Sequence, residues 1–129
     1  MNHLLLIQKW MIKNKKDVFL INRTDEFLNE YIASYAERLK WISNFSGSAG
    51  RAIIEKRKAY IFIDGRYTNQ IKTEINENYF TIKHINEYWS HFNNYQNEKI
   101  LILDPSLHSI SEINKIKKII MKMKLNLEF

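Results

Sequence analysis

Hydrophobic positions follow a helical period in some segments of the chain and a strand-like pattern in others. Leu4, Ile7 and Met11, with Trp10 beside them, recur at helical spacing and predict an opening helix that ends near residues 13–16. Short apolar runs predict strands at 17–21, 52–55, 59–63, 79–83 and 99–103. Only three residues, 56–58, separate the second and third runs, so these two strands should form an antiparallel hairpin.

The same periodicity predicts further helices between the strands. They lie at 27–32 (one or two turns), 36–42 (apolar side Leu39, Trp41 and Ile42), 67–75 (Tyr67, Ile71 and Ile75), 88–92 and 110–123 (Ile110, Ile113, Ile116 or Lys117, Ile120 and Met123). Residues 22–25 are polar and predict a turn. Residues 125–129 alternate like a strand that stops with the chain, so we expect the native polypeptide to continue.

Strands that alternate with helices predict an α/β domain, and the hairpin makes its sheet mixed rather than purely parallel. With 129 residues, the chain has the size of one domain, 1–129. It has no cysteine, which excludes disulfides and thiolate chemistry and fits a reducing, cytoplasmic location. No apolar run is long enough to span a bilayer, so the sequence predicts a soluble protein without membrane contact.

The net charge of +6 comes mostly from lysine, and asparagine and isoleucine are also abundant. A codon bias toward A and T explains this composition as well as a basic function does. The lysines of the last helix form the solvated side that an amphipathic helix needs, and no aromatic residue is interleaved with them. Nucleic-acid binding is therefore not expected.

The titratable residues do not form a recognisable active site. No two of the four histidines, His3, His84, His91 and His108, have the i, i+4 spacing of a helical zinc site, so they are interpreted as polar surface residues. Asp64 and Asp104 each follow a predicted strand, where turn formation is favoured over acid–base work. The sequence therefore predicts no catalytic and no metal-binding residue in this chain.

Small residues at 47–50 form neither a phosphate-binding loop nor a nucleophile elbow, because the lysine of the first and the Gly-x-Ser-x-Gly pattern of the second are missing. They predict instead a tight entry into the strand that starts near Arg51, where small side chains let backbones approach closely.

Three motifs nevertheless resemble a known family in their order and spacing. They are Asp25-Glu26-Phe27-Leu28-Asn29-Glu30-Tyr31 with Glu37-Arg38 and Trp41-Ile42, then Asn44-Phe45-Ser46-Gly47-Ser48-Ala49-Gly50, and then Asp64-Gly65-Arg66-Tyr67 with Gln70. Trp89 and Asp104-Pro105 are weaker matches to the same pattern. From about Asp17 onward the chain resembles the creatinase N-terminal-like domain of Xaa-Pro aminopeptidases. It departs from that pattern at Asn44, where the family has glycine, and at Ile63, where it has threonine.

The resemblance implies a mixed sheet flanked by helices, with a layout like that of ribonuclease H. It implies that catalysis belongs to a C-terminal domain of the same polypeptide, absent here, which holds two divalent metals, usually manganese, and cleaves the bond before proline in short peptides. It also implies a homo-oligomer in which the N-terminal domain closes one side of a cleft. Prolidases share this plan, and a stand-alone protein-interaction module is the other alternative.

The resemblance also suggests positions for a cleft or interface: Ile63, Asp64, Arg66, Tyr67 and Trp89. Arg66 could pair with a carboxylate of a substrate, or it could pair within the domain while Tyr67 packs on the sheet. Phe45, Gly47, Ser48, Gly50 and Gly65 are assigned structural roles in the motifs.

Overall fold

The computed structural model describes residues 2–22, 38–45, 50–95, 99–104, 108–123 and 126–128. The predicted helical turns at 27–32, the motif residues 25–31 and 37, the small residues Gly47 and Ser48, and Pro105 lie outside these ranges.

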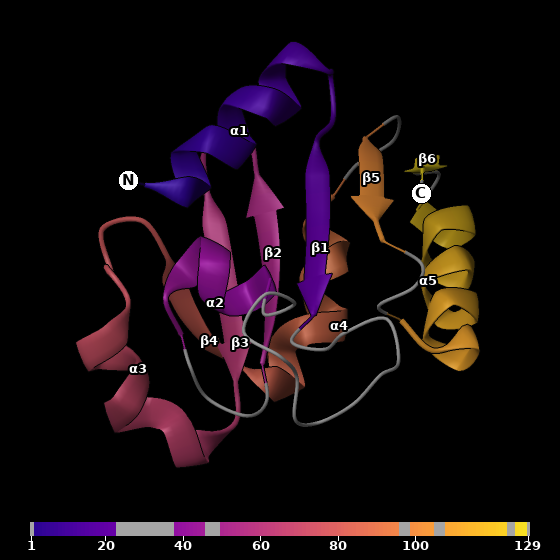
Figure 1. The fold of residues 1–129 in the computed structure, drawn as a ribbon. Coiled ribbons are helices and arrows are strands. Elements are labelled where there is room, and N and C mark those ends of the chain that lie inside the picture. The colour runs from indigo at the N-terminus through magenta and orange to yellow at the C-terminus, as the bar shows by residue number, and fades with distance from the viewer. Residues whose placement is uncertain are drawn as a thin grey trace.

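A six-stranded mixed sheet forms the centre of the domain, in the strand order β4-β3-β2-β1-β5-β6 (Figure 1). The strands are β1 (Val18–Asn22), β2 (Arg51–Glu55), β3 (Ala59–Ile63), β4 (Thr81–His84), β5 (Ile100–Leu103) and β6 (Asn126–Glu128). β2 pairs antiparallel with both β1 and β3, while β4 and β5 add in parallel to β3 and β1, and β6 in parallel to β5. The predicted hairpin and the mixed sheet are both confirmed.

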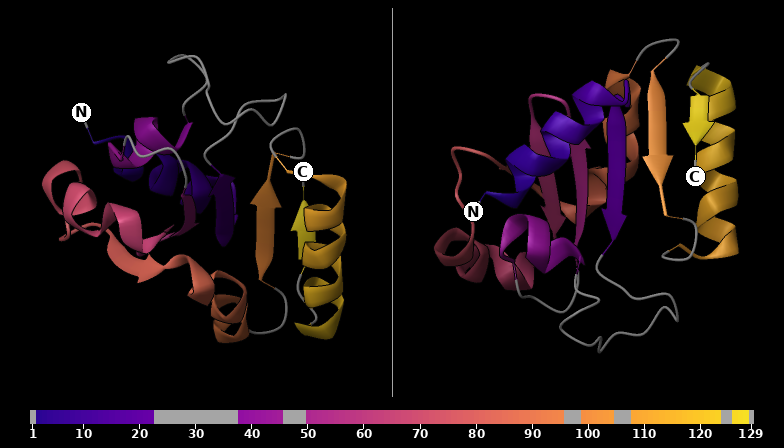
Figure 2. Two further views of the ribbon diagram at one scale, coloured as in Figure 1. Left: turned by 90° about the horizontal axis from the view of Figure 1, so that it is seen from below. Right: turned by 45° about the horizontal axis from the view of Figure 1, so that its top comes forward.

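Helices cover the two faces of this sheet. They are α1 (His3–Lys13), α2 (Arg38–Ser43), α3 (Thr68–Glu74), α4 (Tyr88–His91) and α5 (Ile110–Met123), with 3₁₀ turns η2 (Gly65–Tyr67), η3 (Ile85–Glu87) and η4 (Phe92–Asn94). One core cluster contains residues of α1, α2 and α3, and the other contains residues of α4 and α5. Figure 2 shows α5 beside β5 and β6, away from α1 and α2.

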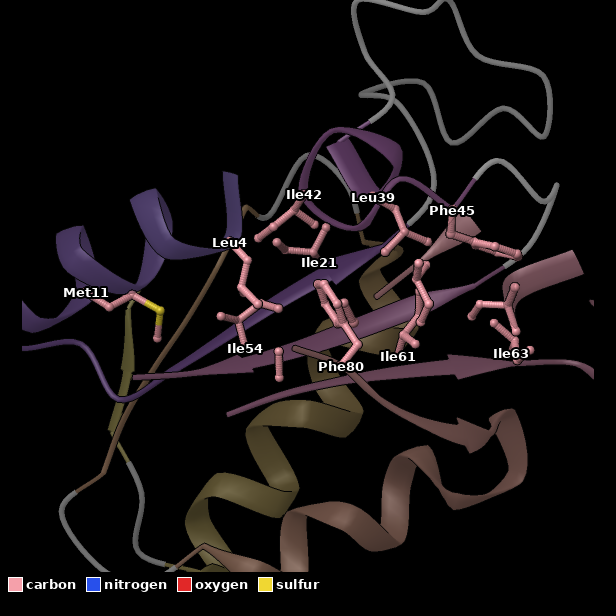
Figure 3. Packing of buried hydrophobic residues seen from close by; sticks show 14 residues of the cluster. Leu4, Met11, Ile21, Leu39, Ile42, Phe45, Ile54, Ile61, Ile63 and Phe80 are labelled. Atoms are coloured by element: carbon pink, nitrogen blue, oxygen red, sulfur yellow. The ribbon is translucent and has the colours of Figure 1, made fainter. Parts of the chain in front are cut away.

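Strand periodicity explains why two cores form. Successive side chains of a strand point to opposite faces, so Ala52 and Ile54 enter the α1–α3 core while Ile53 between them enters the α4–α5 core. Ile61 and Phe62 divide in the same way on β3. Because both faces are covered, these strands appear in the sequence as unbroken apolar runs. Figure 3 shows side chains of α1 and α2 meeting those of the strands in the first core.

The first helix is fixed at its start and along its inner side. The Asn2 side chain accepts a hydrogen bond from the Leu5 N–H at 3.2 Å and so caps the helix. Leu4 and Met11 face the core, and Gln8 between them donates through Nε2 to the carbonyl of Glu55 at 3.0 Å. This amide therefore ties α1 to the end of the β2–β3 hairpin.

Several expectations about single residues are wrong. Trp41 is 48% exposed and stacks on the His3 ring at 4.1 Å between centroids, instead of sharing the buried side of α2 with Leu39 and Ile42. Ile110 was expected on the apolar face of α5 but is 81% exposed, and the buried residues of that face, Ile116 and Ile120, lie further along the helix.

Polar residues give the second group of corrections. His91 and His108 are buried rather than on the surface, and Asn22 is the last, buried residue of β1 rather than part of a turn. The fourth predicted strand begins at Thr81, two residues later than expected. Asn22 contacts His108 and Glu112, which lie 86 and 90 residues away in the sequence, whereas His91 bonds Tyr95, only 4 residues away.

Candidate functional site

Five strands, β1, β3, β4, β5 and β6, run in the same direction and end at the same edge of the sheet, which we call the carboxyl edge. β1 and β5 run in the same direction in Figure 1, and β3 with β4 runs parallel to them through the antiparallel β2. The Asp64-Gly65-Arg66-Tyr67 motif follows β3 at this edge and forms η2. Loops at the carboxyl ends of strands are the usual place for binding sites in α/β folds.

Asp64 and Arg66 form a compact turn. Asp64 Oδ1 accepts hydrogen bonds from the backbone N–H of Arg66 at 2.8 Å and from its Nε at 3.2 Å. The backbone hydrogen bond, with the guanidinium in support, holds the pKa of the Asp64 carboxyl below its usual value. The Arg66 side chain is 68% exposed, so it is oriented by Asp64 while its guanidinium remains accessible at the surface.

Tyr67 joins this motif to the glycine-rich one. Its ring packs edge-on against the buried Phe45 ring at 5.5 Å and lies partly buried against the first core. The Arg66 guanidinium is 5.3 Å from the centre of the Tyr67 ring. Ile63, at the end of β3, is buried in the same core and contributes packing.

The two described ends of the glycine-rich motif 44–50 are constrained in different ways, Gly50 by close contacts and Asn44 by its backbone conformation. At Gly50, an added Cβ would lie 3.1 Å from both Leu39 Cδ2 and Phe45 Cε2, so a larger residue would have to displace them. Gly65, in the Asp64–Tyr67 motif, differs from Gly50 because an added Cβ would meet nothing within 4 Å there. Asn44 adopts a left-handed backbone with φ of 69°, which glycine favours and asparagine tolerates, so asparagine suits the position where the family has glycine.

Trp89 lies on the opposite face of the sheet from Tyr67. It packs against the second core, where Lys115 Nζ is 4.2 Å and the Arg51 guanidinium 5.7 Å from the ring centre. The structure therefore brings Ile63, Asp64, Arg66 and Tyr67 together but places Trp89 across the sheet from them.

A polar network beside Trp89 was not predicted from the sequence. Glu112, in the first turn of α5, pairs with Arg51 Nη2 and contacts His108 Nδ1 at 2.9 Å and Asn22 Nδ2 at 3.1 Å. Burial opposes ionisation of Glu112, but His108 and the Arg51 charge outweigh it and lower the pKa of this carboxyl. The only local sequence signal was the i, i+4 spacing of His108 and Glu112, because the other partners come from distant strands.

Three buried polar atoms at this network, Arg51 Nη1, the Tyr88 hydroxyl and His108 Nε2, have no hydrogen-bond partner among the residues that the structure describes. Burial raises the pKa of Tyr88, so its hydroxyl stays protonated as a donor. Nowhere in the described ranges do three histidine or acidic side chains come together in a group that could hold a metal ion. Within the same ranges, none of the helices combines the length and the apolar character needed to cross a bilayer.

Comparison with known proteins covers nearly the whole chain. The family model described as Creatinase/Prolidase N-terminal domain matches residues 4–126. A probable Xaa-Pro aminopeptidase P of Botryotinia fuckeliana is 34% identical over 121 residues, which is 90% of this chain but only 18% of that protein. The chain thus spans less than a fifth of the length of this relative.

Solved structures share the fold at low identity. The X-prolyl aminopeptidase of Caenorhabditis elegans, described as a cytosolic enzyme with a di-nuclear active site, superposes with a TM-score of 0.85 at 21% identity over 97% of this chain and 23% of its own. The N-terminal creatinase/prolidase-like domain of a Corynebacterium diphtheriae metallopeptidase, solved alone, gives 0.64 at 17% identity, over 97% of this chain and 94% of its own. The chain belongs to the creatinase/prolidase N-terminal domain family and corresponds to the N-terminal domain of Xaa-Pro aminopeptidase and prolidase proteins.

Proposed function

We propose that this chain is the non-catalytic N-terminal domain of a metal-dependent Xaa-Pro aminopeptidase, which removes an N-terminal residue that precedes proline. The observation that carries the proposal is the uneven coverage of the relative: the match fills 90% of this chain and 18% of a probable Xaa-Pro aminopeptidase P. The activity then belongs to the remaining length of such a polypeptide, together with its two divalent metals, for which manganese is the expected identity. A cytoplasmic location agrees with the cysteine-free sequence and with the cytosolic description of the nematode enzyme.

Within such an enzyme, the carboxyl edge would close one side of the active-site cleft and contribute to subunit contacts. Ile63 and Asp64 would hold the turn, while Arg66 and Tyr67 present a cation and an aromatic ring next to each other at the surface. An arginine oriented by a carboxylate suits the recognition of another carboxylate, whether from a peptide substrate or from a neighbouring subunit. Trp89 lies on the other face of the sheet and would serve a subunit contact instead.

The experiment that tests the cleft role is Arg66→Ala in the polypeptide made from the whole reading frame, with Lys72→Ala as the matched control. Lys72 is exposed on α3 of the same domain, so its loss changes the charge equally. We expect Arg66→Ala to raise KM or lower kcat for a proline-containing tripeptide about tenfold, the loss of one charge-assisted hydrogen bond, while Lys72→Ala leaves both unchanged. Unchanged kinetics and an unchanged oligomeric state in Arg66→Ala would contradict the cleft role.

The prolidase alternative is separated by substrate length. A prolidase hydrolyses Xaa-Pro dipeptides, whereas an aminopeptidase also acts on longer peptides with proline in the second position. Cleavage of dipeptides alone would move the proposal to a prolidase. If the polypeptide from the whole reading frame hydrolyses neither dipeptides nor longer peptides, a stand-alone protein-interaction module would be favoured.

A further inference from the structure

A cavity of about 650 Å³ lies far from the carboxyl edge, between the β2–β3 turn and α4. It includes residues that precede β1 and β5, so it lies at the opposite end of those strands. Its walls carry five cationic side chains: Lys56, Arg57, Lys58, Lys83 and Lys99. Two carboxylates, Asp17 and Glu55, also line it. We call this cavity the basic pocket.

Both carboxylates are already engaged by other groups of the domain. Asp17 pairs with Lys56 Nζ at 3.1 Å and accepts the N–H of Ile100 at 2.7 Å. Glu55 Oε2 accepts the Tyr95 hydroxyl at 2.7 Å and lies 3.8 Å from His91 Nε2. The contact with His91 and the Tyr95 hydrogen bond outweigh burial and lower the pKa of Glu55.

The neighbours of the buried His91 determine which of its two ring nitrogens carries the proton. Its Nδ1 faces Lys83 Nζ and Asn94 Nδ2, both at 3.5 Å, and both are donors, so Nδ1 is the acceptor. The ring proton is then on Nε2, which donates to the Tyr95 hydroxyl at 3.0 Å, and that hydroxyl donates to Glu55. The His91 ring, the Tyr95 hydroxyl and the Glu55 carboxylate thus accept hydrogen bonds from groups of the domain itself. The Lys83 ammonium lies at the pocket, 5.3 Å from the Tyr60 ring centre.

Positive charge therefore remains in excess. Five cations and two carboxylates leave +3 on the described residues of the pocket. None of Arg57, Lys58, Lys83 and Lys99 has a carboxylate within ion-pair distance in the described part of the chain. Like charges that converge on a cavity repel one another, and a bound multivalent anion would remove that repulsion.

We propose that the basic pocket binds a small anion of the pyrophosphate type, either as the free ion or as the phosphate chain of a nucleotide. Lysine ammonium groups are point-charge ligands suited to phosphate oxygens. The excess of +3 matches the charge of a diphosphate group near neutral pH. The volume falls within the range of about 300–1,000 Å³ found for small-molecule pockets, which is larger than a single phosphate requires. This proposal is independent of the peptidase assignment.

Calorimetric titration at about 150 mM salt tests the proposal with three probes: inorganic pyrophosphate, ADP and ATP. Binding of pyrophosphate as tightly as ADP would assign the free ion or any diphosphate, and binding of ADP or ATP at least tenfold tighter would assign a nucleotide. Either result supports the pocket. No heat and no change in Tm with millimolar amounts of all three probes would overturn it.

Two double lysine variants test whether the probe binds in the basic pocket. The double variant Lys58→Ala/Lys83→Ala should weaken binding of the best probe at least tenfold, whereas Lys72→Ala/Lys118→Ala, which removes the same charge from exposed positions on α3 and α5, should change it less than twofold. Because Lys58 and Lys83 lie at the surface of the pocket, both doubles should keep the wild-type circular dichroism spectrum. Equal weakening in the two doubles would overturn the pocket in favour of general charge attraction. Tighter, steeply salt-dependent binding of an RNA oligonucleotide that displaces the probe would overturn it in favour of a nucleic-acid surface.

Discussion

The ion pair between Glu112 and Arg51 gives the sharpest prediction for stability. Glu112→Ala removes a carboxylate that holds Arg51, His108 and Asn22 together across α5, β2 and β1. The His108 side chain is almost fully buried, and those of Glu112 and Arg51 are 15% and 26% exposed. Removing one partner therefore leaves a cation and a histidine without their acceptor in a largely dry site.

The expected cost follows from this burial. Breaking a fully buried ion pair costs about 3–5 kcal/mol, and the partial exposure of Arg51 lets water compensate some of it, so we expect about 2–3 kcal/mol. For a chain of 129 residues, about 4 °C of Tm corresponds to each kcal/mol, so Tm should fall by about 8–12 °C. Urea unfolding followed by circular dichroism at pH 7 measures the change, with the m-value unchanged.

A matched control and a double-mutant cycle isolate the interaction. Glu77→Ala, at an exposed position after α3, should change the free energy of unfolding by less than about 0.5 kcal/mol. Arg51→Ala and Glu112→Ala should not be additive, with a coupling of at least about 1 kcal/mol. A Glu112→Ala cost as small as that of Glu77→Ala, or strictly additive single costs, would show that this ion pair does not stabilise the fold.

Three further predictions concern single groups. Gly50→Ala should cost about 1–2 kcal/mol of unfolding free energy because its Cβ would press on Leu39 and Phe45, while Gly65→Ala should stay within about 0.5 kcal/mol; thermal melts compare the two, and equal costs would contradict the packing argument. Asn44→Ala should cost about 1 kcal/mol more unfolding free energy than Asn44→Gly, since both variants lose the hydrogen bond from Asn44 Nδ2 to the Glu74 carbonyl but only alanine disfavours the left-handed backbone; equal costs in urea unfolding would count against it. The pKa of Glu112 is lowered on folding, so its contribution is complete above the unfolded value of about 4.5 and is lost as pH falls through the folded pKa; the stability difference between wild type and Glu112→Gln should therefore shrink below about pH 4.5, and a pH-independent difference would contradict the shift.

The core of the fold could be predicted from the sequence because its signals are local. Ile53 and Phe62 lie in unbroken apolar runs, as strands do when both faces are covered. The motifs at 44–50 and 64–67 could be identified from their spacing, and the structure adds that they touch through Phe45 and Tyr67.

The polar interior could not be predicted, for a physical reason. Asn22 and His108 both contact Glu112, and His91 bonds the Tyr95 hydroxyl, which in turn bonds Glu55. The bonds from Asn22 to Glu112 and from Tyr95 to Glu55 join residues 90 and 40 positions apart, which no local pattern reveals. Periodicity also assigns an apolar face without saying what covers it. Trp41 is an example, because periodicity placed it on the apolar side of its helix but the ring stacks on His3 at the surface.

We propose that this chain is the accessory domain of an Xaa-Pro aminopeptidase, with catalysis in the remaining length of the polypeptide. The most direct test is hydrolysis of a tripeptide with proline in the second position, with added manganese, by this chain and by the polypeptide from its whole reading frame. We expect cleavage by the longer polypeptide and none by residues 1–129. Cleavage by residues 1–129 alone, or a longer polypeptide that is folded, loaded with manganese and still inactive on such peptides, would contradict it.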